Sequence, residues 1–219
     1  MIRSFFRGLL ILIGVIFLTA LTQIGGIVLL LSLALNRVKW HKFRGRGGLL
    51  FAAVYLLATY VTVPLVAPLF GRERVVHSES IQPANRLTDL LNRNYIRPEL
   101  NVLLYKAERE LAGSDIQISY LDANFPFFNG FPLLPHLSHS DGKKIDLSFI
   151  YTNPAGDLTH RPPTRSGYGG FAAPLPGEPD QIAACREKGY WQYDFTRYFT
   201  LGTSRPDLNF SVDHTRQLI

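Results

Sequence analysis

The sequence predicts two N-terminal transmembrane α-helices followed by a small α+β domain. Two long apolar runs without charge, helical and strand spacing after position 84, and an uneven charge distribution support this fold class. The 219 residues carry a formal net charge of +6. Residues 1–74 hold nine Lys or Arg and one acid, a charge of +8, whereas residues 75–219 hold fourteen basic and sixteen acidic residues. A basic, apolar first third therefore precedes a slightly acidic remainder.

Charge and composition exclude several classes of protein. The positive charges flank hydrophobic runs instead of covering a folded surface, which argues against a nucleic-acid-binding domain and a nucleic-acid partner. The chain has no short repeat and no sustained heptad, and Cys185 is its single cysteine. Collagen-like, coiled-coil and disulfide-framework classes are therefore excluded.

Each uncharged run is long enough for a transmembrane helix. The first lies between Arg7 and Arg37 and predicts a helix over about 8–35, and the second predicts one over about 48–70. About 20 apolar residues suffice to cross a bilayer. Buried core helices are the alternative for both runs. A cleaved signal peptide is the alternative for the first, although such apolar regions are typically about 7–15 residues long.

The segment between the two runs predicts their orientation. Residues 36–48 contain five Lys or Arg and no acid, and loops of this kind stay cytoplasmic. We therefore expect a multi-pass membrane protein, with the lipid bilayer as a partner and residues 75–219 on the extracytoplasmic side. The N-terminus would cross with Arg3 and Arg7. Trp40 and Phe43 fit either interfacial anchoring or an ordinary solvated loop.

The polar part of the chain divides by composition. Residues 1–74 form the predicted membrane anchor, 75–83 a linker, and 84–219 the extracytoplasmic domain. Leucine spacing predicts a helix from Pro98 to a stop at Gly113. Alternation predicts strands over 116–120 and 144–151, the second ended by a turn at 153–156.

Long loops connect these elements. Residues 124–135 are dense in aromatics and prolines, and 152–180 form a long loop rich in proline and glycine. Six aromatics within 190–199 could line a substrate groove or pack a core. Asp213 is a candidate helix N-cap close to Ile219, where the sequence given ends. Because a new amphipathic helix starts there, we expect the domain to continue further and this chain to be C-terminally incomplete.

One polar segment combines residues that bind metal ions. Residues 136–146 read H-x-S-H-x-x-G-x-x-x-D, from His136 to Asp146. Gly142 can adopt positive φ and reverse the chain, which would bring His139 beside Asp146. Imidazole and carboxylate both bind Zn²⁺ at about 2.0–2.2 Å, and catalytic zinc sites use three protein ligands. The alternative to a metal site is a structural role, in which the histidines simply lie in a polar turn and the aspartate caps a loop.

This segment resembles the motif of the penicillin-insensitive murein endopeptidases and, more loosely, that of the related D-Ala-D-Ala metallopeptidases. The resemblance covers about residues 113–151. It implies a zinc D-Ala-D-Ala peptidase-like fold and a hydrolase that cleaves amide bonds of D-amino-acid-containing cross-link peptides in peptidoglycan. It also implies that His139 and Asp146 are zinc ligands, with His136, Ser138 and Gly142 lining the site. With the two apolar runs, the resemblance implies a multi-pass protein of the bacterial cytoplasmic (inner) membrane with residues 75–219 on the periplasmic side.

The sequence departs from the family's pattern in two ways. Lys144 stands close to the metal motif, where its ammonium would repel a metal ion unless it points away. The family's third ligand belongs to an H-x-H pair, and this sequence contains no such pair and no glutamate in an E-x-x-H context. We therefore expect the third ligand and the general base to lie beyond Ile219. The chain itself would bind zinc weakly and lack turnover, and its catalytic residues stay unidentified.

Three functions are consistent with these features. The first is a membrane-anchored zinc metallopeptidase of the cell wall, and the second is a non-catalytic membrane protein that binds cell-wall peptides or a partner through its aromatic loop. The third is a two-helix membrane scaffold without a ligand. Close approach of His139 and Asp146 would argue against the third.

Overall fold

A computed structural model describes residues 2–37, 45–134, 136–169, 174, 176–190, 198, 200–203 and 205–219. The chain forms two compact units, and each unit is built from three segments that alternate along the sequence. The anchor unit comprises Met1–Val75, Leu87–Asn101 and Ala123–Lys144. The body unit comprises Val76–Arg86, Val102–Asp122 and Ile145–Ile219. The apolar N-terminal third therefore packs with two later segments instead of ending at a linker after residue 74.

Two helices of the anchor unit are long and apolar enough to cross a membrane, Ile2–Thr22 and Arg46–Phe70. The first of them, α1 (Ile2–Thr22), covers only part of the predicted helix over 8–35. The chain breaks at Gln23, which has a φ of 64°, and continues as the separate helix α2 (Gly25–Leu35). The single helix predicted for this run is therefore wrong. Helical spacing and lack of charge could not reveal a reversal at one uncharged polar residue.

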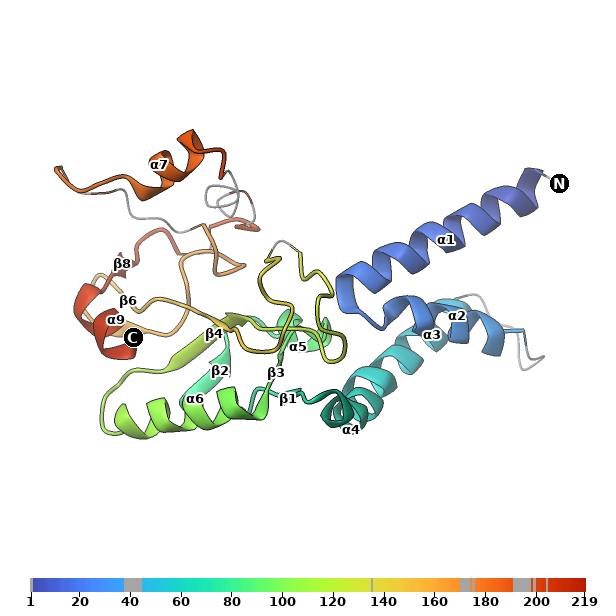
Figure 1. Ribbon diagram of the computed structural model, residues 1–219, viewed down its shortest axis with the longest axis horizontal. Helices are drawn as coiled ribbons and strands as arrows, with labels where there is room; N and C mark the ends of the chain where they lie inside the picture. The colour runs from blue at the N-terminus through green and yellow to red at the C-terminus, as the bar shows by residue number, and fades with distance from the viewer. Residues whose placement is uncertain are drawn as a thin grey trace. The chain divides into compact units, whose positions relative to one another are not determined.

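Helices α1 and α2 pack against each other as a hairpin. A Cβ atom on Gly26 would lie 2.1 Å from Oγ1 of Thr19 and 2.7 Å from the carbonyl oxygen of Val15. Only glycine permits this close approach of the two helices. The N-terminus and the end of α2 consequently lie on the same side, away from the turn at Gln23 (Figure 1).

The second long helix changes its winding along its length. It runs through α3 (Arg46–Leu57), the π-helix η1 (Ala58–Thr62), α4 (Val63–Val66) and the 3-10 helix η2 (Ala67–Phe70). Pro64 has no N–H to bond the preceding turn, and a wider turn before it relieves the clash of its ring with that turn. The predicted helix over 48–70 thus forms, with prolines at 64 and 68 accommodated by local rewinding.

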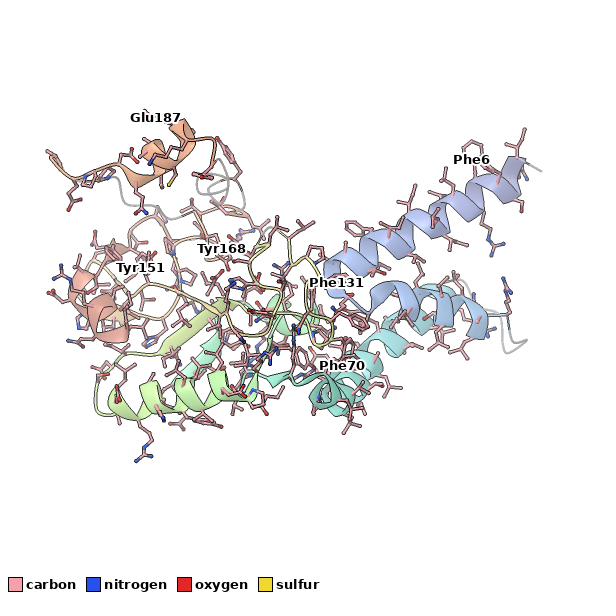
Figure 2. The ribbon with its side chains drawn as sticks, in the orientation of Figure 1. Phe6, Phe70, Phe131, Tyr151, Tyr168 and Glu187 are labelled. Carbon is pink, nitrogen blue, oxygen red and sulfur yellow. The ribbon has the colours of Figure 1, made fainter. Side chains whose placement is uncertain are left out.

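One face of this helix packs within the anchor unit, and the other is exposed. Tyr55, Val63 and Ala67 belong to an apolar core that also contains Val28 and Tyr95. The hydroxyl of Tyr55 donates a hydrogen bond to the carbonyl oxygen of Leu90 (2.7 Å). The opposite face exposes several large apolar side chains, among them Leu49, Leu57, Leu65 and Leu69. Helix α1 also exposes apolar side chains along its length, including Phe6 (Figure 2).

The rest of the anchor unit is short and irregular. Strand β1 (Glu73–Arg74) pairs antiparallel with β3 (Tyr95–Ile96), and α5 (Leu87–Leu90) precedes β3. Tyr95 also forms a bridge with Asn124. These pairings fix the start of the segment Ala123–Lys144, which carries the histidine motif.

The body unit contains two small sheets. Strand β2 (Ile81–Pro83) pairs parallel with β4 (Ile118–Asp122), which pairs antiparallel with β5 (Asp146–Leu147). In the second sheet β6 (Tyr151–Thr152) lies between β7 (Leu158–Thr159) and β8 (Asn209–Phe210). Helix α6 (Pro98–Glu110) precedes β4, α7 (Gln181–Glu187) lies between β7 and β8 along the chain, and α9 (Val212–Leu218) follows β8.

The α+β prediction for this region is confirmed in outline, with several differences in detail. The strand predicted over 144–151 is divided into β5 and β6, which belong to different sheets. The turn after β6 forms as predicted, with Gly156 at a φ of 91°. Ser211 occupies the N-cap position of α9, and Asp213 lies in its first turn instead of capping it. Most of the aromatic segment 190–199, like Trp40 and Phe43, lies outside the described residues.

Candidate metal centre

The two histidines of the motif are held together by a tight turn. The amide N–H of His139 donates to the carbonyl oxygen of His136 at 3.0 Å. This bond closes the turn and brings the two imidazole ring centroids to 5.5 Å. His136 therefore has a defined position relative to His139, which spacing in a loop did not predict.

His139 is buried and oriented by the backbone. It is 5% exposed, and its Nδ1 lies 2.8 Å from the carbonyl oxygen of Ala123. Because a carbonyl oxygen can only accept, Nδ1 donates its proton there, and Nε2 is the ring nitrogen that could bind a metal ion. Metal-ligating histidines are commonly oriented in this way, by a hydrogen bond from the second ring nitrogen to a carbonyl. The pattern at His139 is that of a metal ligand.

Asp146 lies at the start of β5, where its carboxylate receives a hydrogen bond. The hydroxyl of Tyr168 donates to Oδ2 of Asp146 at 2.8 Å. Asp146 is paired with Asp122 in the ladder between β5 and β4, next to a register shift. Tyr168 thus orients the carboxylate by one oxygen. Residue patterns do not predict this role, because Tyr168 lies in a glycine-rich stretch without periodicity.

Ligand atoms of the two histidines and the aspartate come together. One ligand atom each of His136, His139 and Asp146 lies within 4.8 Å of the others, and all three belong to the continuous segment 136–146. Among the residues that the structure describes, this group could hold a metal ion. Predicted ligands His139 and Asp146 are thus adjacent, and His136, expected only to line the site, offers a third ligand atom.

Gly142 and two arginines hold the loop between the histidines and the aspartate. Gly142 has a φ of +81°, as predicted, and a Cβ there would lie 3.1 Å from Cγ of Arg97 and 3.2 Å from Nε of Arg72. Arg97 donates from Nε to the carbonyl oxygen of Asp141 (2.9 Å). The amide of Lys143 donates to the Asp141 carboxylate, and this bond is the main cause that lowers the pKa of Asp141. Gly142 is required both for its backbone conformation and for this close packing.

Arg72 ties this loop to the end of the long apolar helix. It is 1% exposed, and its guanidinium donates to the carbonyl oxygen of Phe125, to Oδ1 of Asn129 (2.7 Å) and to the carbonyl oxygen of Ser140 (3.1 Å). Burial lowers the pKa of Arg72, and the charge of Arg97 acts in the same direction. One buried cation just after η2 is therefore bonded both to the aromatic loop, at Phe125 and Asn129, and to the histidine motif, at Ser140.

Two further polar side chains close the loop. Asn124 is fully buried, accepts from the Gly142 amide (3.1 Å) and donates to the carbonyl oxygen of Lys144 (2.7 Å). The ammonium of Lys144 donates to the carbonyl oxygen of Ser138 at 2.8 Å, so its charge is engaged by the turn between the histidines. Ser138 itself is exposed. Asn124 and Arg72 were missed by sequence reasoning, since their partners are mostly backbone groups.

The aromatic loop packs against the apolar helices of the anchor unit. The rings of Phe127 and Phe128 lie 5.0 and 5.5 Å from that of Phe70, at the end of η2. The amide of Phe127 donates to Oε1 of Gln23 at 2.9 Å. The loop therefore joins the turn of the α1–α2 hairpin to the end of the second long helix, and much of its aromatic surface is used in packing.

The donor set fits a zinc ion. Two imidazoles and one carboxylate are the ligands of many catalytic zinc sites, which keep a fourth position for water. The hydrogen bonds at His139 Nδ1 and Asp146 Oδ2 supply the outer contacts that such ligands usually have.

No protein-family model, curated protein or solved structure gives a significant match to this chain. The resemblance to the murein endopeptidases therefore stays a prediction from the residues of the motif.

Proposed function

We propose that the chain is a membrane-anchored zinc hydrolase that acts on D-amino-acid-containing cross-link peptides of bacterial peptidoglycan. The observation that carries this proposal is the approach of the three ligand atoms of His136, His139 and Asp146 to within 4.8 Å. A group of three ligands is what a catalytic zinc site requires from the protein. In this proposal His136 is the third ligand, so that zinc binding does not need a later H-x-H pair.

Each residue has a separate part in this site. A zinc ion in such a site acidifies its bound water towards a pKa of about 7 and polarises the carbonyl of a bound amide. His139 presents Nε2 because Ala123 holds the proton on Nδ1. Tyr168 keeps one oxygen of Asp146 engaged and so directs the carboxylate. Lys144 turns its charge to the Ser138 carbonyl, which reduces repulsion of a cation.

We also propose a membrane topology that differs from the one expected from the sequence. Because α1 and α2 form a hairpin, the two ends of the first apolar run lie on the same side. Arg3, Arg7 and the basic segment 36–48 would then all be cytoplasmic, as loops rich in Lys and Arg generally are. Helix α2 has 11 residues and is about 16 Å long, about half of the hydrocarbon thickness, so in this topology it would return only part of the way and the residues after Leu35 would have to complete the return to the cytoplasmic side.

In this proposed topology the histidine motif lies near the boundary between the cytoplasmic membrane and the water on its periplasmic side. The loop that precedes the motif contacts Gln23 and Phe70, which lie at the ends of the two long helices. Aromatic side chains concentrate at such boundaries. The proposed substrate is therefore cell-wall peptide close to the cytoplasmic membrane.

Labelling of single cysteines tests the topology. Cys185 is the only native cysteine, so a membrane-impermeant maleimide applied outside intact cells should label it. In a Ser4→Cys, Cys185→Ser variant the same reagent should react only after the membrane is opened. Labelling of both positions from the outside would contradict the hairpin topology and support the expectation that both termini are periplasmic.

Hydrolysis of a purified cross-linked muropeptide dimer tests the activity. The full chain in lipid nanodiscs with zinc should release monomers, and both His139→Ala and Asp146→Asn should abolish release. His214→Ala changes a histidine outside the metal group and should keep the activity. Zinc binding without any release would refute the hydrolase and favour the non-catalytic peptide-binding alternative.

A further inference from the structure

The body unit contains a cavity of about 570 Å³ that shares no residue with the metal group. Its lining comes from β2, β4 and β7, from the chain that follows β2 and β7, and from Gln117 before β4 and Arg205 before β8. Pockets of about 300–1,000 Å³ are typical of small-molecule sites. The cavity is therefore large enough for a small ligand.

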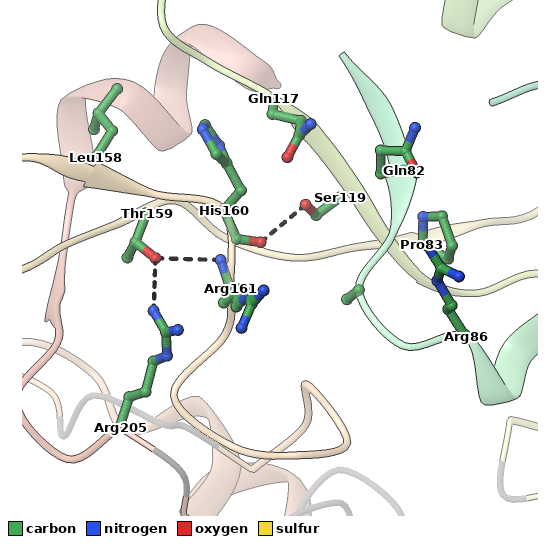
Figure 3. Close-up of a pocket in the computed structure, with 11 residues that line it drawn as sticks. Gln82, Pro83, Arg86, Gln117, Ser119, Leu158, Thr159, His160, Arg161 and Arg205 are labelled. Atoms are coloured by element: carbon green, nitrogen blue, oxygen red, sulfur yellow. Dashed lines mark hydrogen bonds between the residues drawn. The ribbon is translucent and has the colours of Figure 1, made fainter. Parts of the chain in front are cut away.

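The lining of this cavity is strongly basic. It includes Arg86, Arg161 and Arg205 together with His160, and none of the eleven described residues that line it is acidic. Figure 3 shows Arg161 and Arg205 on one side of the cavity and Arg86 beside Pro83 on the other. Three like charges around one hollow repel each other, and an anion between them would relieve that repulsion.

Hydrogen bonds order the side of the cavity that carries two of the arginines. The hydroxyl of Ser119, a buried residue of β4, donates to the carbonyl oxygen of His160 at 3.0 Å. Nη1 of Arg205 lies 3.4 Å from Oγ1 of Thr159, which also accepts from the Arg161 amide at 3.4 Å. These contacts connect the loop after β7 to β4 and direct Arg205 along the wall.

We infer that this cavity binds a small molecule through an oxyanion group, either a carboxylate or a phosphate. All three cations are arginines, whose planar guanidinium groups match both groups with paired hydrogen bonds. Ser119, Thr159, Gln82 and Gln117 add polar groups that can bond the remainder of a ligand. This inference is independent of the proposed hydrolase activity.

Binding measurements with two simple probes test the inference. The full chain carries His139→Ala, so that an anion cannot bind through a metal ion, and is placed in nanodiscs of zwitterionic lipid. Inorganic phosphate and N-acetyl-D-alanine are titrated separately by calorimetry at low ionic strength. Saturable binding of either probe supports the site, and the stronger probe identifies the preferred oxyanion.

Substitutions identify the cavity as the place of binding. Arg161→Gln and Arg205→Gln should each weaken binding about tenfold or more, because each removes charged hydrogen bonds. Arg86 is exposed, so Arg86→Gln should weaken binding without affecting folding. Arg109→Gln removes the same charge from an exposed position outside the cavity and should leave binding unchanged. The inference would be overturned if neither probe bound, or if all three cavity variants bound the probes as tightly as the chain without these substitutions.

Discussion

Replacement of Arg72 by methionine should release the histidine-bearing segment from the end of the second long helix. The guanidinium supplies three hydrogen bonds to this segment, to Phe125, Asn129 and Ser140. Each buried acceptor left without a donor costs about 1–3 kcal/mol. Removal of the charge recovers part of its desolvation cost, and Nε of Arg72 has no hydrogen-bond partner among the described residues. The net loss of local stability should therefore be about 2–4 kcal/mol.

Hydrogen exchange measures this loss directly. Amides within 123–142 should exchange about 30- to 700-fold faster in Arg72→Met, since each 1.4 kcal/mol corresponds to a factor of ten. Arg72→Lys keeps the charge but not the planar fork and should have an intermediate effect. Arg109→Met, at an exposed position of α6, serves as the control. Unchanged exchange of this segment in Arg72→Met would refute the claim that Arg72 holds it.

Three further changes test other parts of the structure. Gly26→Ala should destabilise the fold by about 1–3 kcal/mol, because the added Cβ would clash with Thr19 and the α1 backbone. This loss is measured as a lower melting temperature in detergent. Gly8→Ala, with open space around it, should have no such effect, and equal melting temperatures would contradict the hairpin packing. Tyr168→Phe should weaken zinc binding about 10- to 100-fold in a metal titration, because it removes the donor to the metal-binding carboxylate. Burial raises the pKa of Tyr151, so its stabilising contribution is full below about pH 10 and falls as the pH rises through the raised value. Tyr151→Phe should therefore lose less stability than the wild type in alkaline denaturation, and identical pH profiles would contradict this.

The apolar runs and the alternation after position 84 were sufficient to predict helices in the anchor and an α+β body. The break at Gln23 was not predictable, because it depends on the contact of Gly26 with Thr19 and not on a local signal. Division of the strand over 144–151 between two sheets also depends on distant partners, since β8 supplies one of them.

Part of the candidate site could be predicted from residue types and spacing. The positive φ of Gly142 and the approach of His139 to Asp146 follow from the motif. The position of His136 depends on a turn bond, and Tyr168 comes from a loop more than twenty residues away in sequence. Single-sequence patterns carry no information about such contacts. The possible ligand role of His136 and the hydrogen bond from Tyr168 are therefore seen only in the structure.

Zinc content of the purified full chain tests the central claim most directly. After incubation with zinc and removal of unbound metal, the wild type should retain about one zinc ion per chain. His139→Ala and Asp146→Ala should each lose it, and His136→Ala should weaken binding at least about tenfold because one of three ligands is removed. The assignment of His136, His139 and Asp146 as a metal centre would be contradicted if the wild type retained no zinc. It would also be contradicted if all three variants retained as much zinc as the wild type.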